Sequence, residues 1–301
     1  MSKPRHEPFK TPPRIDPGPN HCWVQNWEMS DEFERSLTDS WMRRQRWETI
    51  NPTWKGRAPS FFKKDNVIVQ NGSMKLRSRE DNPPAYFPSM YKDFSTAFVR
   101  TRKRSLYGYF EIYCRMMDSK ISSAFWFAYN TPNEWTELDV FEYSTSDKPT
   151  SFGKPYKQLF NTNMHVHRNP NGVKMSSPQV YDAGFDLSAQ PVKVGFNWQE
   201  DKIQWYLNDK LVREEKNEYF HQPLHLQLDS EAFPIWFGLP ETGGCHKNSL
   251  PNAFEIFYVR SWNRSVHTSR TRSKLSHLKK TLKLTFSCIL HWLATHRKAR
   301  S

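Results

Sequence analysis

The 301-residue sequence lacks several features that mark common classes of protein. Its four cysteines, Cys22, Cys114, Cys245 and Cys288, form no C-x-x-C pair and show no metal-ligand spacing, which argues against a cysteine-bound metal or a dithiol redox centre. The first ten residues contain no hydrophobic signal segment, and no apolar run is long enough to span a bilayer. We expect Cys114 to be a small buried residue, and a Cys22–Cys245 disulfide stays an open alternative.

Acidic residues are absent from positions 264–301, which carry ten of the 44 lysines and arginines. The preceding residues are close to neutral, so the formal net charge of +13 does not indicate nucleic-acid binding by that part of the chain. Apolar residues in the tail recur at three- and four-residue steps, which predicts a basic amphipathic helix able to contact an anionic surface. The alternative is an extension without function. The apolar positions are Leu275, Leu278, Leu282, Phe286, Ile289, Leu290 and Leu293.

The remaining sequence predicts an all-β domain over residues 21–263. Short alternating runs, such as those at 67–69, 74–77, 97–99, 192–196 and 224–228, are rich in aliphatic and aromatic side chains. Turn signals separate them, including Asn71-Gly72, Pro83-Pro84, Asn171-Gly172 and Asn208-Asp209. This pattern is typical of an antiparallel two-sheet β-sandwich. Residues 1–20 are rich in proline and charge, and we expect them to form a disordered leader.

Three carboxylates with the spacing E-x-D-x-x-E lie within the segment 134–143, E-W-T-E-L-D-V-F-E-Y. Glu137 and Asp139 are two residues apart and would share one face of a strand, whereas Glu142 would point to the other face. A β-bulge at Val140 or Phe141 would return Glu142 to the first face, because it inserts one unpaired residue. Like charges held this closely raise at least one pKa. The alternative is an ordinary polar strand face exposed to solvent.

Glycosidic bond cleavage is the chemistry that uses such a set. A retaining glycosidase places a nucleophilic carboxylate roughly 5–5.5 Å from a carboxylic acid that serves as general acid and base. With a bulge, the two glutamates would be separated by about 13 Å between Cα atoms, which inward-leaning side chains on a curved strand could close. The spacing therefore favours double displacement over inversion.

The flanking motifs resemble those of family 16 glycoside hydrolases. The segments 105–112 (S-L-Y-G-Y-F-E-I), 123–127 (S-A-F-W-F), 197–212 and 254–262 (F-E-I-F-Y-V-R-S-W) are similar to strands of that family, in the same order. Asn163 and His165 match the N-x-H of its agar-cleaving members. The resemblance spans roughly residues 23–263 and implies a jelly-roll sandwich with a concave substrate cleft.

The resemblance also implies roles for individual residues. Glu137 would be the nucleophile, Glu142 the general acid/base, and Asp139 the helper that tunes the nucleophile. No metal and no organic cofactor is expected, since the sequence contains no Asp-rich loop that would require the structural calcium of some relatives.

Substrate contacts are expected from six further residues. Trp54 and Arg57 lie in N-P-T-W-K-G-R, a Pro/Gly-rich segment that resembles one lining the cleft of agar-cleaving members. Trp126 is a second candidate stacking platform. Asn163, His165 and Glu231 are expected as polar contacts, with His167 as a weaker candidate; the alternative for each histidine is a surface residue without function. We expect Trp198 and Trp205 to belong to the core.

The function implied by the resemblance is a retaining endo-β-glycosidase that cleaves internal β-1,4 bonds of a red-algal galactan, with agarose as first choice. Porphyranase, carrageenase and β-1,3-glucanase activities are alternatives of the same fold. A non-catalytic carbohydrate-binding jelly roll is the alternative of another class, and the presence of all three acids disfavours it. We expect a monomer whose partner is its polysaccharide and which binds no nucleic acid. The family implies an extracellular or periplasmic location, although this sequence shows no signal segment.

Overall fold

The computed structural model describes residues 11–34, 46–243 and 250–266. The chain falls into two compact units. The larger comprises Met1–Arg14 and Gln25–Asn263, and the smaller comprises Ile15–Val24 and Arg264–Ser301.

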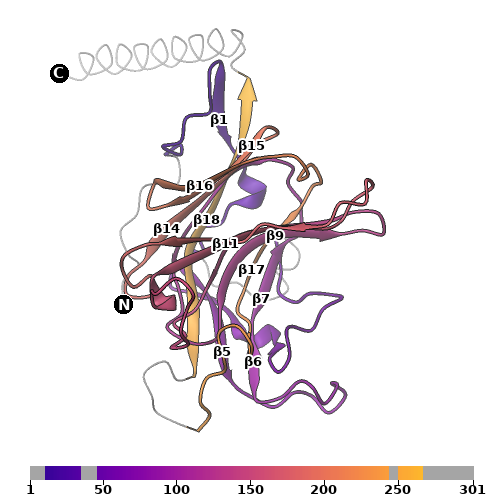
Figure 1. Ribbon diagram of the computed structural model, residues 1–301, viewed down its shortest axis with the longest axis vertical. Helices are drawn as coiled ribbons and strands as arrows, with labels where there is room; N and C mark the ends of the chain where they lie inside the picture. Colours follow the sequence, from indigo (N-terminus) through magenta and orange to yellow (C-terminus); the bar gives the residue numbers. More distant parts are fainter. Residues whose placement is uncertain (1–10, 35–45, 244–249, 267–301) are drawn as a thin grey trace, which may run out of the picture. The chain divides into compact units, whose positions relative to one another are not determined.

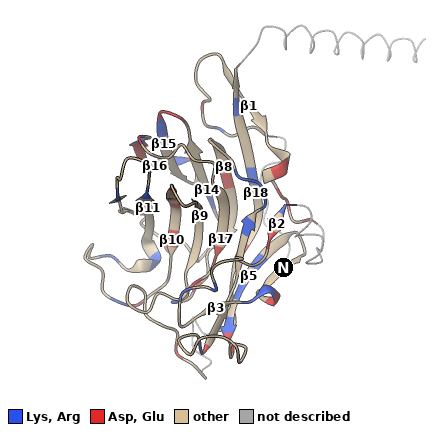
Figure 2. Ribbon diagram, turned by 90° about the vertical axis from the view of Figure 1, so that its right-hand side faces the viewer, with Lys and Arg blue, Asp and Glu red and all other residues tan. Residues whose placement is uncertain are grey.

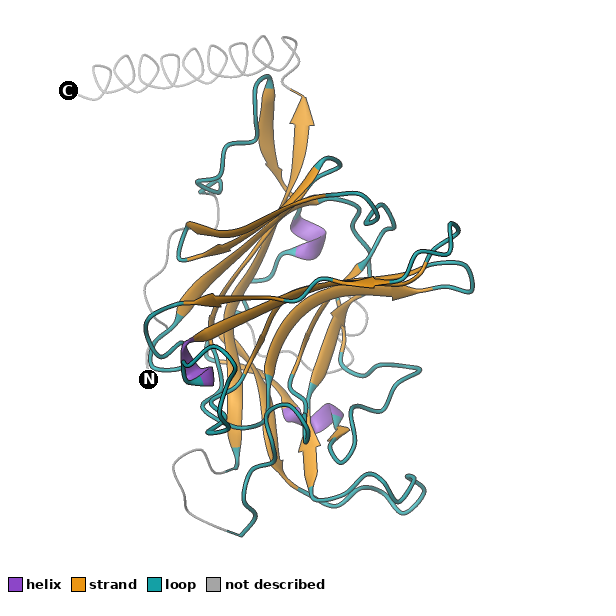
Figure 3. Cartoon of the chain, in the orientation of Figure 1, coloured by secondary structure: helices purple, strands orange, loops and turns teal. Residues whose placement is uncertain are grey.

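Strands of the described ranges form two sheets, which confirms the expected all-β sandwich (Figure 1, Figure 3). The first sheet has ten strands in the order β16-β15-β14-β8-β18-β5-β6-β3, with β4 paired to β5 and β1 paired to β18. Its strands are β1 (His21–Gln25), β3 (Phe61–Phe62), β4 (Val67–Gln70), β5 (Ser73–Glu80), β6 (Phe94–Thr96), β8 (Gly108–Arg115), β14 (Val192–Trp198), β15 (Lys202–Leu207), β16 (Lys210–Lys216) and β18 (Asn252–Val266).

The second sheet has eight strands in the order β12-β11-β10-β9-β17-β7-β2, with β13 paired to β11. Its strands are β2 (Trp47–Glu48), β7 (Phe98–Thr101), β9 (Ser123–Asn130), β10 (Trp135–Tyr143), β11 (Leu159–Arg168), β12 (Met175–Ser176), β13 (Gln179–Asp182) and β17 (His225–Asp229). Short 3₁₀ turns lie at η1 (Trp27–Met29), η2 (Lys64–Asn66) and η3 (Tyr156–Gln158).

The hydrophobic core lies between the two sheets. Alternate residues of each strand face it because successive side chains of a strand point to opposite sides. The Phe127 ring of β9 stacks on the Phe196 ring of β14 with centroids 5.3 Å apart, which joins the sheets directly. Trp198 and Trp205 are fully buried in this core, as the sequence predicted, and Cys114 is buried there too.

Two tight hairpins fix the register of neighbouring strands. Asn71 and Gly72 have φ of 53° and 73° between β4 and β5, and Asn208 and Asp209 have φ of 49° and 66° between β15 and β16. Asparagine, aspartate and glycine tolerate this left-handed region, which two-residue hairpins require. Both turns coincide with turn signals in the sequence.

Residues 11–20 of the expected leader lie within the described ranges, and residues 15–20 of them belong to the smaller unit. The Trp23 indole Nε1 donates to the carbonyl of Ile15 over 2.6 Å, and Gly18 turns the chain with φ of 88°. These contacts give residues 15–24 a defined course, whereas residues 1–10 lie outside the described part. At the other end β18 continues to Val266, beyond the expected limit at 263.

The predicted tail helix begins after the last described residue, so it stays a prediction. None of the helices in the described ranges has the length and apolar character needed to cross a membrane. Cys22 carries a free thiol, which leaves the open Cys22–Cys245 pairing without support; Cys245 and Cys288 lie outside the described residues.

Candidate active site

The expected β-bulge is present in β10. Against β9, Asp139 pairs with Trp126 and Phe141 pairs with Phe125, so Val140 is the extra residue. Against β11, Asp139 pairs with Asn163 and Glu142 with Asn161. The bulge returns Glu142 to the face that carries Glu137 and Asp139, while Leu138, Val140 and Phe141 are fully buried. We call this side of the second sheet the carboxylate face.

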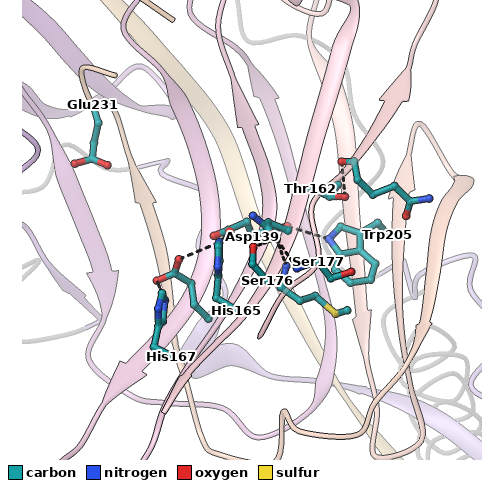
Figure 4. Close-up of polar contacts among 12 residues, drawn as sticks. Asp139, Thr162, His165, His167, Ser176, Ser177, Trp205 and Glu231 are labelled. Atoms are coloured by element: carbon teal, nitrogen blue, oxygen red, sulfur yellow. Dashed lines mark hydrogen bonds and ion pairs between the residues drawn. The ribbon is translucent and has the colours of Figure 1, made fainter. Parts of the chain in front are cut away.

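Two side chains bind the backbone carbonyls that flank the bulge. The indole Nε1 of Trp205, in β15 of the first sheet, donates to the Asp139 carbonyl over 3.1 Å. Asn161 Nδ2 donates to the Glu142 carbonyl over 2.9 Å. Because an irregular strand loses ladder hydrogen bonds, such partners keep buried carbonyls satisfied. Trp205 thereby connects the hydrophobic core to the backbone of the candidate site (Figure 4).

Histidines from β11 line one flank of the carboxylates. His165 Nε2 lies 3.4 Å from Asp139 Oδ2 and 3.9 Å from Glu137 Oε1, and His167 Nε2 lies 3.6 Å from Glu137 Oε2. The two imidazoles stack with centroids 5.1 Å apart, as Figure 4 shows. Trp135 packs against His167 at 4.2 Å between ring centroids. The structure thus brings both predicted histidines to the carboxylates, and His167 is as close as His165.

Burial and mutual repulsion raise the pKa values of two of the three acids. Burial, followed by the charges of Asp139 and Glu137, raises the pKa of Glu142 to about 8. Burial and the Glu137 charge also raise the pKa of Asp139 well above its usual range. The guanidinium groups of Arg57 and Arg213 act in the opposite direction on Asp139. Glu142 therefore retains its proton near neutral pH, which is the state a general acid needs.

Arg213 of β16 is held near the site by several hydrogen bonds. It donates to Thr162 Oγ1 over 2.9 Å and to the carbonyl of Ser177 over 2.9 Å, and its guanidinium lies 4.6 Å from the Trp205 ring centroid. Asn163, opposite Asp139, accepts at Oδ1 from Ser176 Oγ and from the backbone N–H of Ser177. Its amide oxygen is therefore engaged in holding β12 against β11.

The other flank of the carboxylates combines two tryptophan rings with two buried acids, Asp229 and Glu231. Trp126 of β9 pairs with Asp139 of β10, and its indole Nε1 donates to Asp229 Oδ2 over 3.1 Å. The Trp54 ring meets the Trp126 ring edge-on at 6.3 Å between centroids. Both tryptophans remain partly exposed. The segment around Trp54 therefore lies beside the carboxylate face, as the sequence predicted.

Glu231 and Arg57 form the polar end of this flank. Glu231 Oε1 accepts from the Arg57 backbone N–H over 3.0 Å, and Glu231 Oε2 lies 3.6 Å from Arg57 Nη2. The exposed Arg57 guanidinium also lies 4.1 Å from the Phe233 ring centroid. Burial raises the pKa of Glu231 to about 8 even though the Arg57 charge opposes the shift. In Figure 4 Glu231 stands apart from the histidine flank.

Sequence reasoning missed Asp229, Trp135 and Arg213. Asp229 is buried, its Oδ1 has no hydrogen-bond partner among the described residues, and burial together with Glu231 raises its pKa well above the usual range. The alternation of His225, Gln227 and Asp229 along β17 was a signal that could have placed Asp229 on the carboxylate face. Arg213 gave no comparable signal, because its neighbours come from strands distant in sequence.

One set of donors in the site has the composition of a cation site. Ligand atoms of Glu137, Asp139 and His165 lie within 4.8 Å of one another. The same three side chains also suit the carboxylate chemistry described above, which needs no metal. The expected absence of a metal stays a prediction.

Comparisons with known proteins show which proteins the chain is similar to. Residues 23–264 match the family model described as the GH16 domain of β-porphyranases A–D. Among curated proteins, β-porphyranase D of Zobellia galactanivorans is 26% identical over 93% of this chain and 70% of its own length. The κ-carrageenase of Pseudoalteromonas carrageenovora is 25% identical over 83% of this chain and 67% of its own. The crystal structure of porphyranase B from Z. galactanivorans superposes with a TM-score of 0.72 at 24% identity, covering 86% of this chain and 99% of that one.

Proposed function

The chain belongs to glycoside hydrolase family 16, and from this premise we propose that it is a retaining endo-β-glycosidase acting on a red-algal galactan. The observation that carries the proposal is the bulge of β10, which places Glu137, Asp139 and Glu142 on one face of the second sheet. A strand without this bulge would turn Glu142 into the core.

In the first step, an ionised Glu137 carboxylate attacks the anomeric carbon of the bound sugar. The bond from that carbon to the glycosidic oxygen breaks as Glu142 transfers its proton to this oxygen. A pKa of about 8 supports this role, because Glu142 then holds its proton at neutral pH. The product is a glycosyl ester on Glu137 and a released chain end.

In the second step, Glu142 removes a proton from water, and the resulting oxygen nucleophile displaces Glu137 from the anomeric carbon. Two displacements return the original anomeric configuration. Asp139, 3.4 Å from His165 Nε2, is proposed to position the nucleophile through this histidine, whose Nε2 also lies 3.9 Å from Glu137 Oε1. Glu137 is held between the two histidines of β11, with its Oε1 toward His165 and its Oε2 toward His167.

We take porphyran as the preferred substrate, in place of agarose, which the sequence motifs favoured. The matched family model is built on β-porphyranases, and β-porphyranase D is among the relatives. Trp54 and Trp126 are proposed as stacking platforms for sugar rings, and Arg57, Asn163, His165 and Glu231 as polar contacts. Action on such a polymer fits an extracellular or periplasmic location.

Product analysis with a panel of polysaccharides tests this proposal. Purified protein is incubated with porphyran, agarose, κ-carrageenan and laminarin, and products are sized over time while NMR follows the first anomer released. We expect a rapid fall in porphyran chain length and release of the β-anomer. First release of the α-anomer would contradict the retaining mechanism, and cleavage of laminarin alone would contradict the galactan assignment.

A non-catalytic carbohydrate-binding protein is the second candidate. It would bind one of these polymers without shortening it, so the same panel with a binding measurement separates the two functions. The complete set of three carboxylates supports the enzyme.

A further inference from the structure

A basic pocket lies on the outer face of the first sheet, on the side of the sandwich opposite the carboxylate face. It has a volume of about 380 Å³. Its lining residues are Lys75, Arg77, Arg115, Pro251, Asn252, Ala253 and Glu255. We call it the arginine pocket.

Strand alternation explains why these side chains gather there. Met74 and Leu76 of β5 are fully buried in the core, which turns Lys75 and Arg77 outward. Cys114 of β8 is likewise buried, so its neighbour Arg115 also points outward.

Strand pairing brings the outward residues of three strands together. Glu255 of β18 pairs with Lys75 on one side and Arg115 on the other, and Ala253 pairs with Arg77. The small side chain of Ala253 leaves the space beside Arg77 open. Figure 2 shows the charged residues of β5 and β18 from the side.

Positive charge in the pocket is only partly neutralised. Glu255 Oε1 lies 3.4 Å from Lys75 Nζ and accepts from Ser73 Oγ over 2.8 Å. Within the described ranges, neither Arg77 nor Arg115 forms an ion pair. Arg77 Nη2 donates weakly to the Asp65 backbone carbonyl at 3.4 Å.

The Nε atoms of both arginines are buried and have no hydrogen-bond partner among the described residues. A buried donor without a partner is costly, and arginine offers Nε together with one Nη as a fork that matches two oxygens of a tetrahedral anion. Both arginines line the pocket and are partly exposed, so a small shift of either side chain would turn its Nε–Nη fork toward an anion bound there.

A second basic region of the larger unit provides the contrast. Around Trp27, each cation has a carboxylate: Lys103 lies 2.5 Å from Glu28, and Arg102 lies 3.5 Å from Glu48. Arg46 approaches Asp31 at 3.8 Å. The cations of that region are paired with carboxylates, whereas Arg77 and Arg115 of the arginine pocket are not paired with one in the described part of the chain.

We propose that the arginine pocket binds a sulfate ester of a sulfated galactan, at a site separate from the carboxylate face. The choice of a polysaccharide sulfate over a free anion rests on the proposed function. The capacity for a tetrahedral oxyanion rests only on the pocket. Charge-assisted contacts from two guanidinium groups give such a site both affinity and geometric selectivity for oxyanions over chloride.

The first experiment observes the proposed donors directly. The ¹⁵N–¹H signals of arginine Nε are assigned by comparing the protein with Arg77→Gln and Arg115→Gln variants. Inorganic sulfate is then titrated, with sodium chloride at equal ionic strength as the reference. We expect the Arg77 and Arg115 signals to shift saturably with sulfate and not with chloride. Equal shifts with both salts, or no shift, would overturn the site.

The second experiment tests the polymer source of the anion. Affinity for porphyran and for agarose is measured with a Glu137→Gln protein, which removes the proposed nucleophile, and with the same protein carrying Arg77→Gln and Arg115→Gln. We expect the double arginine change to weaken porphyran binding about tenfold, since hydrogen bonds to charged groups are the strong ones, and to leave agarose binding unchanged.

Arg102→Gln combined with Lys103→Gln is the matched control, because it also removes two positive charges, both paired with carboxylates outside the pocket. It is expected to change neither affinity more than about twofold, as for other surface ion pairs. If the control lost as much porphyran affinity as the Arg77 and Arg115 variant, net charge alone would explain the effect, and the proposed site would be rejected. Thermal melting of every variant checks the fold, and Arg115→Lys serves where Arg115→Gln does not fold.

The two experiments separate this inference from the proposed function. A saturable sulfate response at Arg77 and Arg115 in a protein that cleaves no galactan would uphold the oxyanion site and reject the hydrolase. Porphyran cleavage with no sulfate response would do the reverse.

Discussion

Glu137 and Glu142 lie on one strand face but have different roles in the proposed reaction: Glu137 is the nucleophile and Glu142 is the general acid and base. We predict that Glu137→Gln and Glu142→Gln each lower polysaccharide hydrolysis by about three orders of magnitude or more, because neither displacement proceeds without both groups. Initial rates on porphyran, with circular dichroism as the check on folding, measure the effect.

Azide separates the two roles. In a Glu137→Gly variant it should replace the lost nucleophile and give a glycosyl azide of inverted configuration. Near-normal turnover by Glu142→Gln, or an azide product of retained configuration from Glu137→Gly, would reject the assignment.

The raised pKa of Glu142 predicts the alkaline limit of activity. Since the proposed general acid must be protonated before attack, kcat/KM is expected to fall as pH rises through about 8, the folded-state pKa of this group. A pH profile from 5 to 10 with a soluble oligosaccharide measures the midpoint.

Glu231 is the necessary control for that profile, because burial raises its pKa to about 8 as well. A Glu231→Gln variant is expected to keep the alkaline limb. If kcat/KM of this variant no longer fell above about pH 8, the titrating group would be Glu231 and not Glu142.

At single positions, residue spacing alone reached the three carboxylates, whose neighbours are local, whereas Trp54, Trp126 and Glu231 came from the family resemblance. Glu137, Asp139 and Glu142 lie within six positions of one strand, so their spacing and one bulge define the set. Asp229 and Arg213 reach it through strand pairings that join distant parts of the chain. The alternation along β17 can assign Asp229 to one strand face, but only the strand order brings that face beside the carboxylates.

The bulge of β10 depends on a side chain of the opposite sheet. We predict that Trp205→Phe lowers kcat by about tenfold or more, because the Asp139 carbonyl loses its indole donor and the bulge shifts the carboxylates. Stability is expected to fall by about 1–3 kcal/mol, the cost of an unsatisfied buried carbonyl. Steady-state kinetics and urea unfolding measure the two effects.

Trp198→Phe is the matched control, since Trp198 is equally buried and donates its indole N–H to the Phe220 carbonyl over 3.0 Å, away from the carboxylates. It is expected to lose similar stability while kcat stays within about twofold. Equal losses of kcat in both variants would show a general loss of packing.

The Trp54 segment offers a separable test of substrate binding. Trp54→Ala removes a partly exposed ring beside Trp126 and is expected to weaken polysaccharide binding by about 1–3 kcal/mol, if stacking on sugars resembles stacking on bases. Binding isotherms and melting temperatures are compared with Trp27→Ala, which removes another exposed tryptophan. A lower melting temperature with unchanged affinity would place Trp54 in a structural role.

Strands and hairpins were predictable where side-chain alternation and turn residues are strong, as at β4, β5, β14 and β15. The bulge was predictable because only it reconciles E-x-D-x-x-E with one face. The donation from Trp205 to Asp139 was not, because it crosses between sheets whose packing no single strand specifies. Trp205 was expected in the core, but its hydrogen bond to the bulged strand of the site was not expected.

For the chain as a whole, the basic tail of residues 264–301 contributes none of the residues assigned to the proposed chemistry. Every residue assigned to the site precedes Val266, the end of β18. We predict that a protein ending at residue 266 hydrolyses a soluble oligosaccharide within about twofold of the full chain, as expected for a terminal segment without site residues.

The same truncation is expected to weaken binding to anionic vesicles or sulfated polymers and to reduce its salt dependence, because it removes a cluster of positive charge. An inactive or unfolded truncation would show that the tail is part of the catalytic fold.

The carboxylate face and the arginine pocket lie on the outer faces of opposite sheets, with the shared core between them. A sugar unit held at the arginine pocket therefore belongs to a different stretch of polymer, or to a different molecule, from the unit being cut. One protein would tether itself to its substrate while it works. Such bivalency raises the local concentration of cleavable bonds for long sulfated chains only. Short oligosaccharides, which occupy one face at a time, would be cut without that advantage, so catalytic efficiency would grow with chain length beyond what the active site alone can explain.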